Sequence, residues 1–321
     1  PHFGRRVPFS KGHNPSPWLE MIHLEEDGLP SSYPAKPGEN GRWSLCPENA
    51  GSKKYNVHFI HTPMMLADKQ GNTPAIMDEG GLIYVLHEEE AAIRKNNDLK
   101  FPLVVRSNIY DCVDWMLTSE WDDDDFSNFH ASKVNTHWHF LQFDNQSSDG
   151  VITGFSNEQS VRPFTMLEKK TDKGLPLPLN TTFTKAAKKG ERVITVKNAA
   201  QYHPEIEILI GADNVGGNEV GRIKSIKGNE ITLVRPLKND HPVKDIVTVE
   251  FVRQRFWVDS DVGTVFWHDH ALGRITWGHG GFGTMIVEPV GSTYHNPKTG
   301  APIRSGPLAD IRTAEPVGYG V

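Results

Sequence analysis

Two short histidine motifs constrain the fold of this chain more than any other feature. They are His137-Trp138-His139 and His268-Asp269-His270, and each lies in a segment rich in strand-forming residues. On a strand, residues two apart project from the same face, about 6–7 Å from each other, so each triplet directs two imidazoles to one side while its central residue faces away. Neither triplet is accompanied by a zinc-type cysteine pair. The pattern predicts a multi-histidine site on β-strands, and four neutral imidazoles suit copper, zinc or iron rather than calcium or magnesium.

The overall composition indicates a globular protein with a substantial core. The 321 residues, 37% of them hydrophobic, suffice for one large domain or two to three small ones. The formal net charge of −6 and the pI of about 6.2 argue against a general nucleic-acid binder. The sequence has no run of about 18 apolar residues that would suggest a membrane span. Because the chain begins with Pro1 rather than with Met and a signal-like run, we expect a mature or excised polypeptide.

Frequent turn-forming residues predict a fold made mainly of short strands. The 29 glycines and 22 prolines leave room for a short helix at 88–97. Segments of strand-like composition, each bounded by turn formers, are 55–60, 82–86, 103–105, 112–117, 137–143, 248–253, 262–267 and 282–287. Many short strands at such spacing predict an all-β Greek-key sandwich or barrel.

The segment between the two triplets, at about 180–247, has its own succession of strands. We expect these strands at 192–196, 207–210, 219–226 and 231–234. We interpret the segment as a small inserted β module. Its motifs Glu207-Ile-Leu-Ile-Gly211 and Gly228-Asn-Glu-Ile-Thr-Leu233 resemble compact β modules of surface and phage-tail proteins. No chemistry is assigned to it.

Three segments around the triplets carry a family resemblance. Asn135-Thr-His-Trp-His139, Gly263-Thr-Val-Phe-Trp-His-Asp-His270 and Gly281-Phe-Gly-Thr-Met-Ile-Val-Glu-Pro289 resemble the half of a multicopper oxidase that contains paired His-X-His motifs. Ser107-Asn-Ile-Tyr-Asp-Cys-Val113 also resembles the strand entry that opens such a cupredoxin domain. The resemblance spans most of 55–300 apart from the insert. Shorter segments at 142–150, 158–163 and 291–300 resemble the large bacterial branch that includes manganese-oxidising enzymes.

The resemblance implies a cupredoxin-like Greek-key β-sandwich interrupted by the inserted module. We expect five segments along the chain. They are an N-terminal extension or linker at 1–54, the first part of the cupredoxin domain at 55–179, the inserted module at 180–247, the second part of the domain at 248–291, and a C-terminal tail or linker at 292–321.

The resemblance also implies roles for individual residues in copper binding. His137 corresponds to a ligand of the type 2 copper and His139 to a type 3 ligand, while His268 and His270 correspond to ligands of one type 3 copper each. Together they make half of a trinuclear cluster. Asp149 resembles the family's acidic residue that orients the type 2 site and relays protons during oxygen reduction. The alternative interpretation of Asp149 is a turn former before Gly150.

The chain departs from the family pattern in what it lacks. A complete enzyme also needs a His-Cys-His segment for the type 1 copper and a further His-X-His pair. Cys46 and Cys112 are the two cysteines of the chain, and neither has a histidine neighbour. This chain alone therefore has no type 1 copper and an incomplete trinuclear site. The two cysteines either form one disulfide or remain separate buried thiols.

Three explanations of the missing half are open: a fragment of a larger polypeptide, one subunit of a split oxidase, or a degenerate relative. The expected partner is a second cupredoxin half with the His-Cys-His segment, on the same precursor or a separate chain. Further expected partners are dioxygen and a small reductant or metal ion, with no nucleic acid and no membrane span. The resemblance implies an extracellular or periplasmic protein, with the cell surface as an option.

Two other function classes compete with a copper oxidase. One is a mononuclear cupin-like or zinc hydrolase site. A cupin requires a Glu a few residues after the first triplet, whereas the acidic residue in 140–144 is an Asp. The other is a non-catalytic cupredoxin scaffold that uses the insert for contacts. We interpret the scattered histidines as structural or exposed, and His279 as a candidate neighbour of the site. The scattered histidines are His58, His61, His130, His203, His241 and His295.

Overall fold

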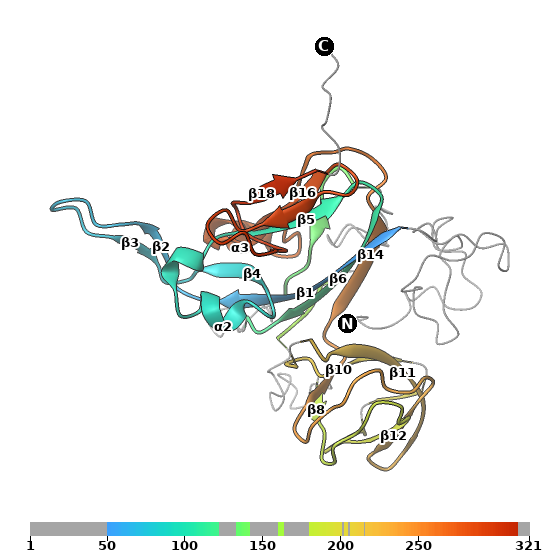
Figure 1. The fold of residues 1–321 in the computed structure, drawn as a ribbon. Coiled ribbons are helices and arrows are strands. Elements are labelled where there is room, and N and C mark those ends of the chain that lie inside the picture. The colour runs from blue at the N-terminus through green and yellow to red at the C-terminus, as the bar shows by residue number, and fades with distance from the viewer. Residues whose placement is uncertain are drawn as a thin grey trace.

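Two four-stranded sheets enclose one hydrophobic core and form the main body of the protein (Figure 1). The computed structural model describes residues 50–121, 133–141, 160–163 and 180–313, apart from 201, 205 and 215. The first sheet has the order β14 (Val252–Trp257), β6 (Asp111–Ser119), β1 (Gly51–His61) and β4 (Leu82–Leu86). The second has the order β5 (Leu103–Asn108), β16 (Phe282–Glu288), β15 (Thr264–His268) and β7 (His137–Trp138).

The chain passes repeatedly from one sheet to the other. It runs from β1 and β4 in the first sheet to β5 in the second, returns for β6, crosses to β7, returns for β14 and ends with β15 and β16. The pairs β1–β6 and β5–β16 are parallel, and the other pairs of these two sheets are antiparallel. Such crossovers are typical of Greek-key sandwiches. The predicted all-β, cupredoxin-like class is confirmed.

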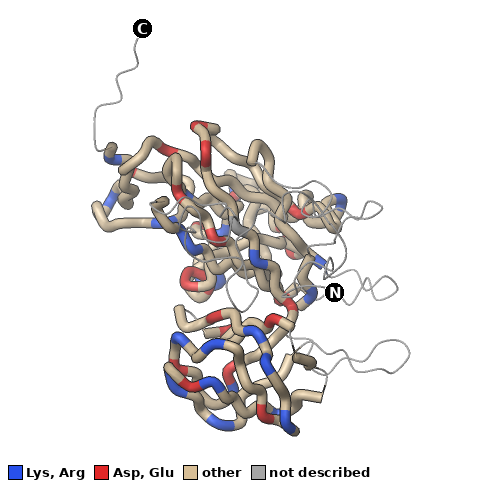
Figure 2. Tube along the Cα trace, turned by 90° about the vertical axis from the view of Figure 1, so that its right-hand side faces the viewer, with Lys and Arg blue, Asp and Glu red and all other residues tan. Residues whose placement is uncertain are grey.

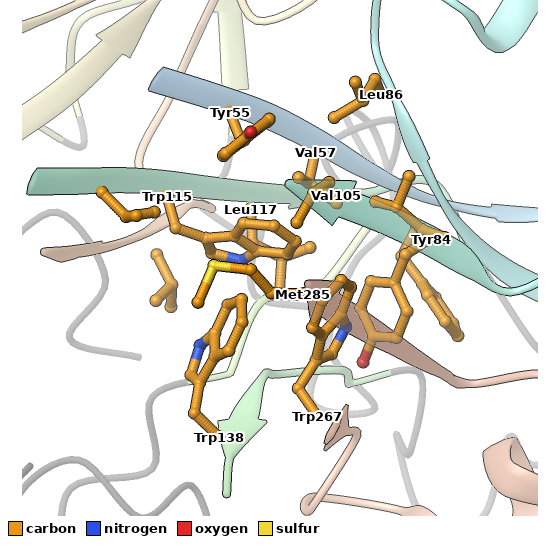
Figure 3. Close-up of a cluster of buried hydrophobic side chains, with 14 of the residues drawn as sticks. Tyr55, Val57, Tyr84, Leu86, Val105, Trp115, Leu117, Trp138, Trp267 and Met285 are labelled. Atoms are coloured by element: carbon orange, nitrogen blue, oxygen red, sulfur yellow. The ribbon is translucent and has the colours of Figure 1, made fainter. Parts of the chain in front are cut away.

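Three tryptophans fill the centre of the core between the two sheets (Figure 3). Trp115 on β6 packs against Trp138 and Trp267 from the second sheet, with ring centroids 4.9 and 5.1 Å away. The Trp138 and Trp267 centroids are 4.7 Å apart. Edge-to-face and tilted contacts of this kind stabilise aromatic pairs beyond their burial. The strands that contain the histidine triplets are therefore anchored by large side chains on their core-facing side.

The segment from Asn180 to Thr248 forms a separate six-stranded sheet with its own core. Its order is β8 (Asn180–Thr182), β13 (Ile246–Thr248), β10 (Glu207–Ile210), β11 (Glu219–Lys227), β12 (Glu230–Leu233) and β9 (Val193–Thr195). Asn180 and Thr248 are cross-strand partners, so the first and last residues of the segment lie next to each other. Met116 and Phe251 pack with Leu209 and Ala212 where it meets the sandwich. The predicted domain boundaries stay a prediction.

Several elements differ from the sequence-based expectations. The prediction of one strand at 248–253 was wrong, because β13 ends at Thr248 and β14 begins at Val252. The expected helix at 88–97 is reduced to α2 (Glu90–Ile93) and the 3-10 turn η2 (Asn97–Leu99). The hairpin of β2 (Met64–Ala67) and β3 (Ile76–Asp78), and that of β17 (Thr293–His295) and β18 (Asp310–Arg312), had no recognised sequence signal.

Basic and acidic residues are interspersed along the described trace, in the sandwich and in the inserted segment alike (Figure 2). Within the described residues, none of the helices has the length and apolar character needed to span a membrane.

Candidate metal centre

The register between β7 and β15 brings the two histidine triplets together. His137 lies directly opposite His268, and Trp138 lies opposite Trp267. Because side chains alternate along a strand, the two tryptophans enter the core and the histidines occupy the other face of the sheet. The predicted alternation within both triplets is therefore present: Trp138 is buried in the core, and the buried Asp269 points away from the imidazoles into the loop that follows β15.

All four imidazoles lie in one group. The ring of His137 is 4.3 Å from that of His270 and 5.1 Å from those of His139 and His268, measured between centroids. The Nε2 atoms of His139 and His268 are 3.0 Å apart. One nitrogen from each of His137, His139 and His268 falls within 4.8 Å of the others. The structure thus places together all four histidines that the sequence selected.

The protonation of His268 fits a metal-binding role. Burial lowers its pKa to about 4, and the neighbouring histidines act in the same direction, so the ring is neutral near pH 7. Its Nδ1 lies 3.0 Å from the backbone oxygen of Asp269, which only accepts hydrogen bonds, so Nδ1 must be the protonated nitrogen. Nε2 then directs a lone pair toward His139. A neutral imidazole fixed in this tautomer is the form that coordinates copper or zinc.

A buried carboxylate organises the loop that contains His270. Asp269 accepts hydrogen bonds from the backbone N–H groups of Ala271 and Leu272, at 3.1 and 3.0 Å, and from the hydroxyl of Thr276 at 2.8 Å. Thr276 ends the short helix α3 (Gly273–Thr276). These three hydrogen bonds to one carboxylate fix the loop from Ala271 to Thr276, on the C-terminal side of the triplet.

Trp277 and His279, in the 3-10 turn η4 (Trp277–His279), lie beside the group in different ways. The ring of Trp277 is 4.1 Å from that of His268, and its Nε1 donates to the backbone oxygen of Asp269 at 2.6 Å. His279 instead bonds through Nδ1 to the carboxylate of Asp78 on β3, at 2.9 Å. His279, expected near the site, therefore links the following turn to the β2–β3 hairpin, and Trp277 is the residue that contacts the group.

One side of the histidine group is open. His268 is only 3% exposed, whereas His137, His139 and His270 are half-buried. Phe140, immediately after the first triplet, is 75% exposed and has a positive φ of 62°. Its ring centroid is 6.3 Å from that of His139. A large apolar side chain thus stands in solvent next to three accessible imidazoles.

Other residues selected from the sequence lie outside the described residues. Asp149, the predicted proton-relaying acid, is one of them, and Cys46 is another. Cys112 lies buried on β6 and its thiol is not free. Its pairing with Cys46 stays a prediction. Sequence reasoning missed the contributions of Asn135 and Trp277, although both flank the triplets by only a few positions.

No protein-family model matches the chain. No curated protein matches it either. Among solved structures, a multi-copper oxidase from Pseudomonas thermotolerans is 11% identical, with a TM-score of 0.32, over 75% of this chain and 30% of that one. Fet3p, a multicopper oxidase that functions in iron import, is 12% identical, with a TM-score of 0.29, over 75% and 24%.

A third solved structure is the Gp54 tailspike of Acinetobacter baumannii bacteriophage AP22, 15% identical, with a TM-score of 0.20, over 23% of this chain and 14% of that one. The chain spans less than a third of the length of either oxidase. Likenesses at these TM-scores do not decide a function. The side chains of the histidine group are therefore what indicates a function.

Proposed function

We propose that this chain is one half of a multicopper oxidase and provides four histidines of a trinuclear copper cluster. The observation that carries the proposal is the convergence of His137, His139, His268 and His270 on one face of β7 and β15. Copper bound there would supply the four-electron reduction of dioxygen to water, with electrons from one-electron oxidations elsewhere. In this assignment His137 serves the type 2 copper and the other three serve the type 3 pair.

The task of this chain's own residues is to present neutral, oriented imidazoles. The strand register sets the spacing of His137 and His268, and the backbone oxygen of Asp269 selects the tautomer of His268. The tryptophan core beneath the strands restricts their movement. Asp149 is proposed as the acid that passes protons to the site.

The second half of the site has to come from another domain or chain. The sequence lacks a His-Cys-His segment, so the proposed partner is a second cupredoxin half that holds the type 1 copper. The half-buried imidazoles and the exposed Phe140 support docking at this face, because a large exposed aromatic side chain is a typical interface anchor. An extracellular or periplasmic location belongs to the same proposal.

A mononuclear metal enzyme is the second candidate. The observation that favours it is that nitrogens of only three histidines, His137, His139 and His268, lie within 4.8 Å of one another. Three protein ligands with an open position are typical of catalytic zinc sites. This alternative requires one metal ion per chain and no partner.

Copper content, electron paramagnetic resonance and visible absorption of the natively purified particle test the proposal. Stoichiometric copper, blue absorption and a partner with a His-Cys-His segment are the expected results. Zinc or iron in place of copper, lost in His139→Ala and with no partner, would favour the mononuclear candidate. A purified protein without any metal would favour the third interpretation, a non-catalytic cupredoxin scaffold.

In the intact assembly, His139→Ala and His268→Ala should each abolish oxygen reduction and the type 3 copper while circular dichroism stays unchanged. The reason is that a metal at an interface built by the protein contributes affinity more than folding. Full oxidase activity in either variant would contradict the cluster assignment.

A further inference from the structure

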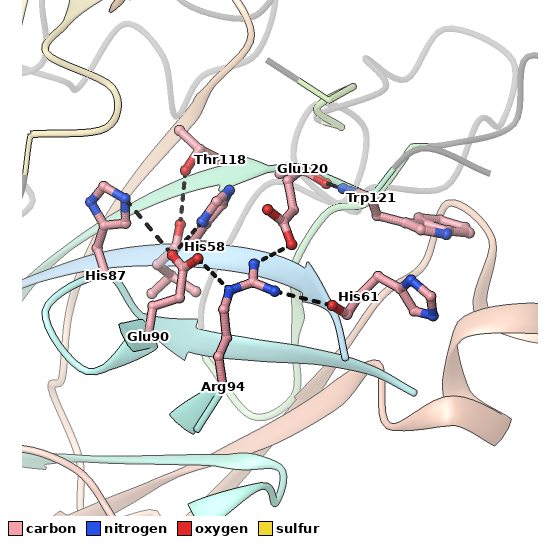
Figure 4. Close-up of polar contacts among 10 residues, drawn as sticks. His58, His61, His87, Glu90, Arg94, Thr118, Glu120 and Trp121 are labelled. Atoms are coloured by element: carbon pink, nitrogen blue, oxygen red, sulfur yellow. Dashed lines mark hydrogen bonds and ion pairs between the residues drawn. The ribbon is translucent and has the colours of Figure 1, made fainter. Parts of the chain in front are cut away.

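A second group of potential metal ligands lies on the outer face of the first sheet (Figure 4). His58 is on β1, between Val57 and Phe59, whose side chains enter the sandwich core. Alternation along the strand therefore turns His58 to the opposite face. His87 follows β4, the antiparallel neighbour of β1, and Glu90 begins helix α2. Short connections thus bring two imidazoles and one carboxylate to the same place.

The carboxylate of Glu90 lies between the two rings. Its Oε2 is 2.8 Å from His58 Nδ1 and 4.0 Å from His87 Nε2. The ring centroids of His58 and His87 are 5.4 Å apart, at 85° to each other. One potential ligand atom from each residue lies within 4.8 Å of the other two. The side chains are 3% exposed for His58, 9% for His87 and 18% for Glu90, so the group is shielded yet reachable from solvent.

Arg94 fixes the orientation of this carboxylate. Its Nε donates to Glu90 Oε1 at 2.8 Å, one turn along the helix, which leaves Oε2 facing the two histidines. The other end of the guanidinium pairs with Glu120. The positive charge of Arg94 is therefore matched by a second carboxylate, Glu120, so that it does not cancel the charge of Glu90 alone. An outer partner that aligns a ligand carboxylate in this way is a regular feature of protein metal sites.

From this geometry we propose that His58, His87 and Glu90 form a mononuclear site for a first-row divalent transition metal. Two histidines and one carboxylate are the donor set of catalytic zinc sites and of non-haem iron(II) sites, both of which keep open positions for water or a ligand. The site is separate from the four-histidine group: the two share no residue, and they lie on different sheets of the sandwich.

The distances are close to those that a bound ion requires. Ligand atoms about 2.1 Å from a tetrahedral or octahedral ion lie about 3.0–3.4 Å from each other. The observed separations from Glu90 Oε2, 2.8 Å to His58 and 4.0 Å to His87, bracket this range. Binding an ion there requires His87 Nε2 to approach Glu90 Oε2 more closely than the observed 4.0 Å. The competing interpretation is a purely structural ion pair of His58 with Glu90, in which His87 has no part.

The experiment uses the full chain with His139→Ala and His268→Ala, which removes two of the three histidines whose nitrogens lie within 4.8 Å of one another in the four-histidine group. This background protein is stripped with a chelator and titrated with Co²⁺, followed by its visible absorption, and then with Zn²⁺ in competition. We expect one Co²⁺ per chain, displaced by Zn²⁺. Adding His87→Ala should weaken binding by at least about tenfold, since even loss of an outer partner of a ligand costs 10–100-fold.

His61→Ala on the same background is the matched control. His61 is an exposed histidine of the same strand, bonded to the backbone oxygen of Glu79, and its removal should leave the Co²⁺ affinity unchanged. His87→Gln, which preserves the size of the side chain, decides the case if the alanine variant does not fold. A background protein that binds no Co²⁺, or equal affinity with and without His87, would overturn the proposal.

Discussion

Asn135 and Asp269 join the two histidine triplets through a reciprocal pair of hydrogen bonds. The backbone N–H of Asn135 donates to Oδ1 of Asp269 at 3.0 Å, and the side-chain oxygen of Asn135 accepts from the backbone N–H of His270 at 2.8 Å. Both residues are buried. Since β7 contains only two residues, these bonds rather than an extended ladder determine how the first triplet lies against the second.

Asp269→Asn should therefore weaken metal binding without removing a ligand. The amide has one accepting oxygen and two N–H donors, so it cannot accept all the backbone N–H bonds of the carboxylate, and each charged bond contributes about 1.5–3 kcal/mol. We expect a 10–100-fold loss of copper affinity and a lower melting temperature. Isothermal titration with copper and thermal unfolding measure the two effects.

Thr276→Val is the graded control for this variant, because it removes one of the bonds to Asp269 and keeps the carboxylate. A smaller loss of stability and near-normal copper affinity are expected. Equal copper affinity in Asp269→Asn and the unaltered chain would show that this loop does not position the histidines.

The four-histidine group could be predicted from sequence because its geometry depends on strand periodicity alone. His137 and His139, and likewise His268 and His270, needed only to lie on strands to share a face. The roles of Asn135 and Asp269 could not be predicted, since a hydrogen bond between residues 134 positions apart depends on the register of β7 and β15. The group around Glu90 was missed for the same reason: His58 and His87 are 29 positions apart and have no motif in common.

The fold was predictable where hydrophobic runs are bounded by turn formers. The strand expected at 82–86 matches β4, and 207–210 matches β10. The prediction was wrong at 248–253, where the apolar Phe251 joins β13 and β14 in sequence but packs against Leu209 at the contact with the insert. Composition alone does not distinguish a buried linker from a strand.

Gly283→Ala should destabilise the strand pair that supports His268. A Cβ at Gly283 would lie 2.3 Å from the ring of Trp267 and 2.6 Å from the backbone oxygen of Leu103. Neither neighbour has room to move, because the ring is buried in the core and the oxygen belongs to the adjacent strand. Overpacking of this kind costs about 1–3 kcal/mol. Chemical denaturation measures the loss.

Gly278→Ala provides the control for this overpacking, since a Cβ at Gly278 meets nothing within 4 Å and lies in the turn η4. Its free energy of unfolding should stay within about 0.5 kcal/mol of the unaltered chain. A loss as large as that of Gly283→Ala would contradict the proposed steric cause.

Deletion of the insert, residues 180–247, should spare copper binding. The two ends of the segment pair with each other at Asn180 and Thr248, so the remaining chain can be rejoined across a short gap. The deletion removes Leu209 and Ala212, which cover Met116 and Phe251, and a lower melting temperature is expected. Copper per chain is the measurement, and its loss would show that the insert supports the site.

The inserted sheet should have a stability maximum between about pH 4.5 and 6.5, set by His241. Its Nδ1 lies 2.8 Å from Asp245 Oδ2 and its Nε2 lies 3.0 Å from Glu219 Oε1. Burial lowers the pKa of His241, but the bonds and charges of Glu219 and Asp245 outweigh burial, so that the pKa is raised above 6.5. For Glu219, burial raises the pKa, and the bonds from His241 and from two backbone N–H groups outweigh it, so that the pKa falls below 4.5.

The two shifts act at opposite ends of this pH range. A raised histidine pKa gives stability that is complete below pH 6.5, the unfolded value, and is lost as the pH rises through the folded value. A lowered glutamate pKa gives stability that is present above 4.5 and is lost as the pH falls. His241→Gln should abolish the alkaline decline seen by scanning calorimetry, whereas His295→Gln, at a half-buried histidine outside the insert, should preserve it. If His241→Gln and the unaltered chain have the same profile above pH 6.5, then His241 is not charged in the folded insert.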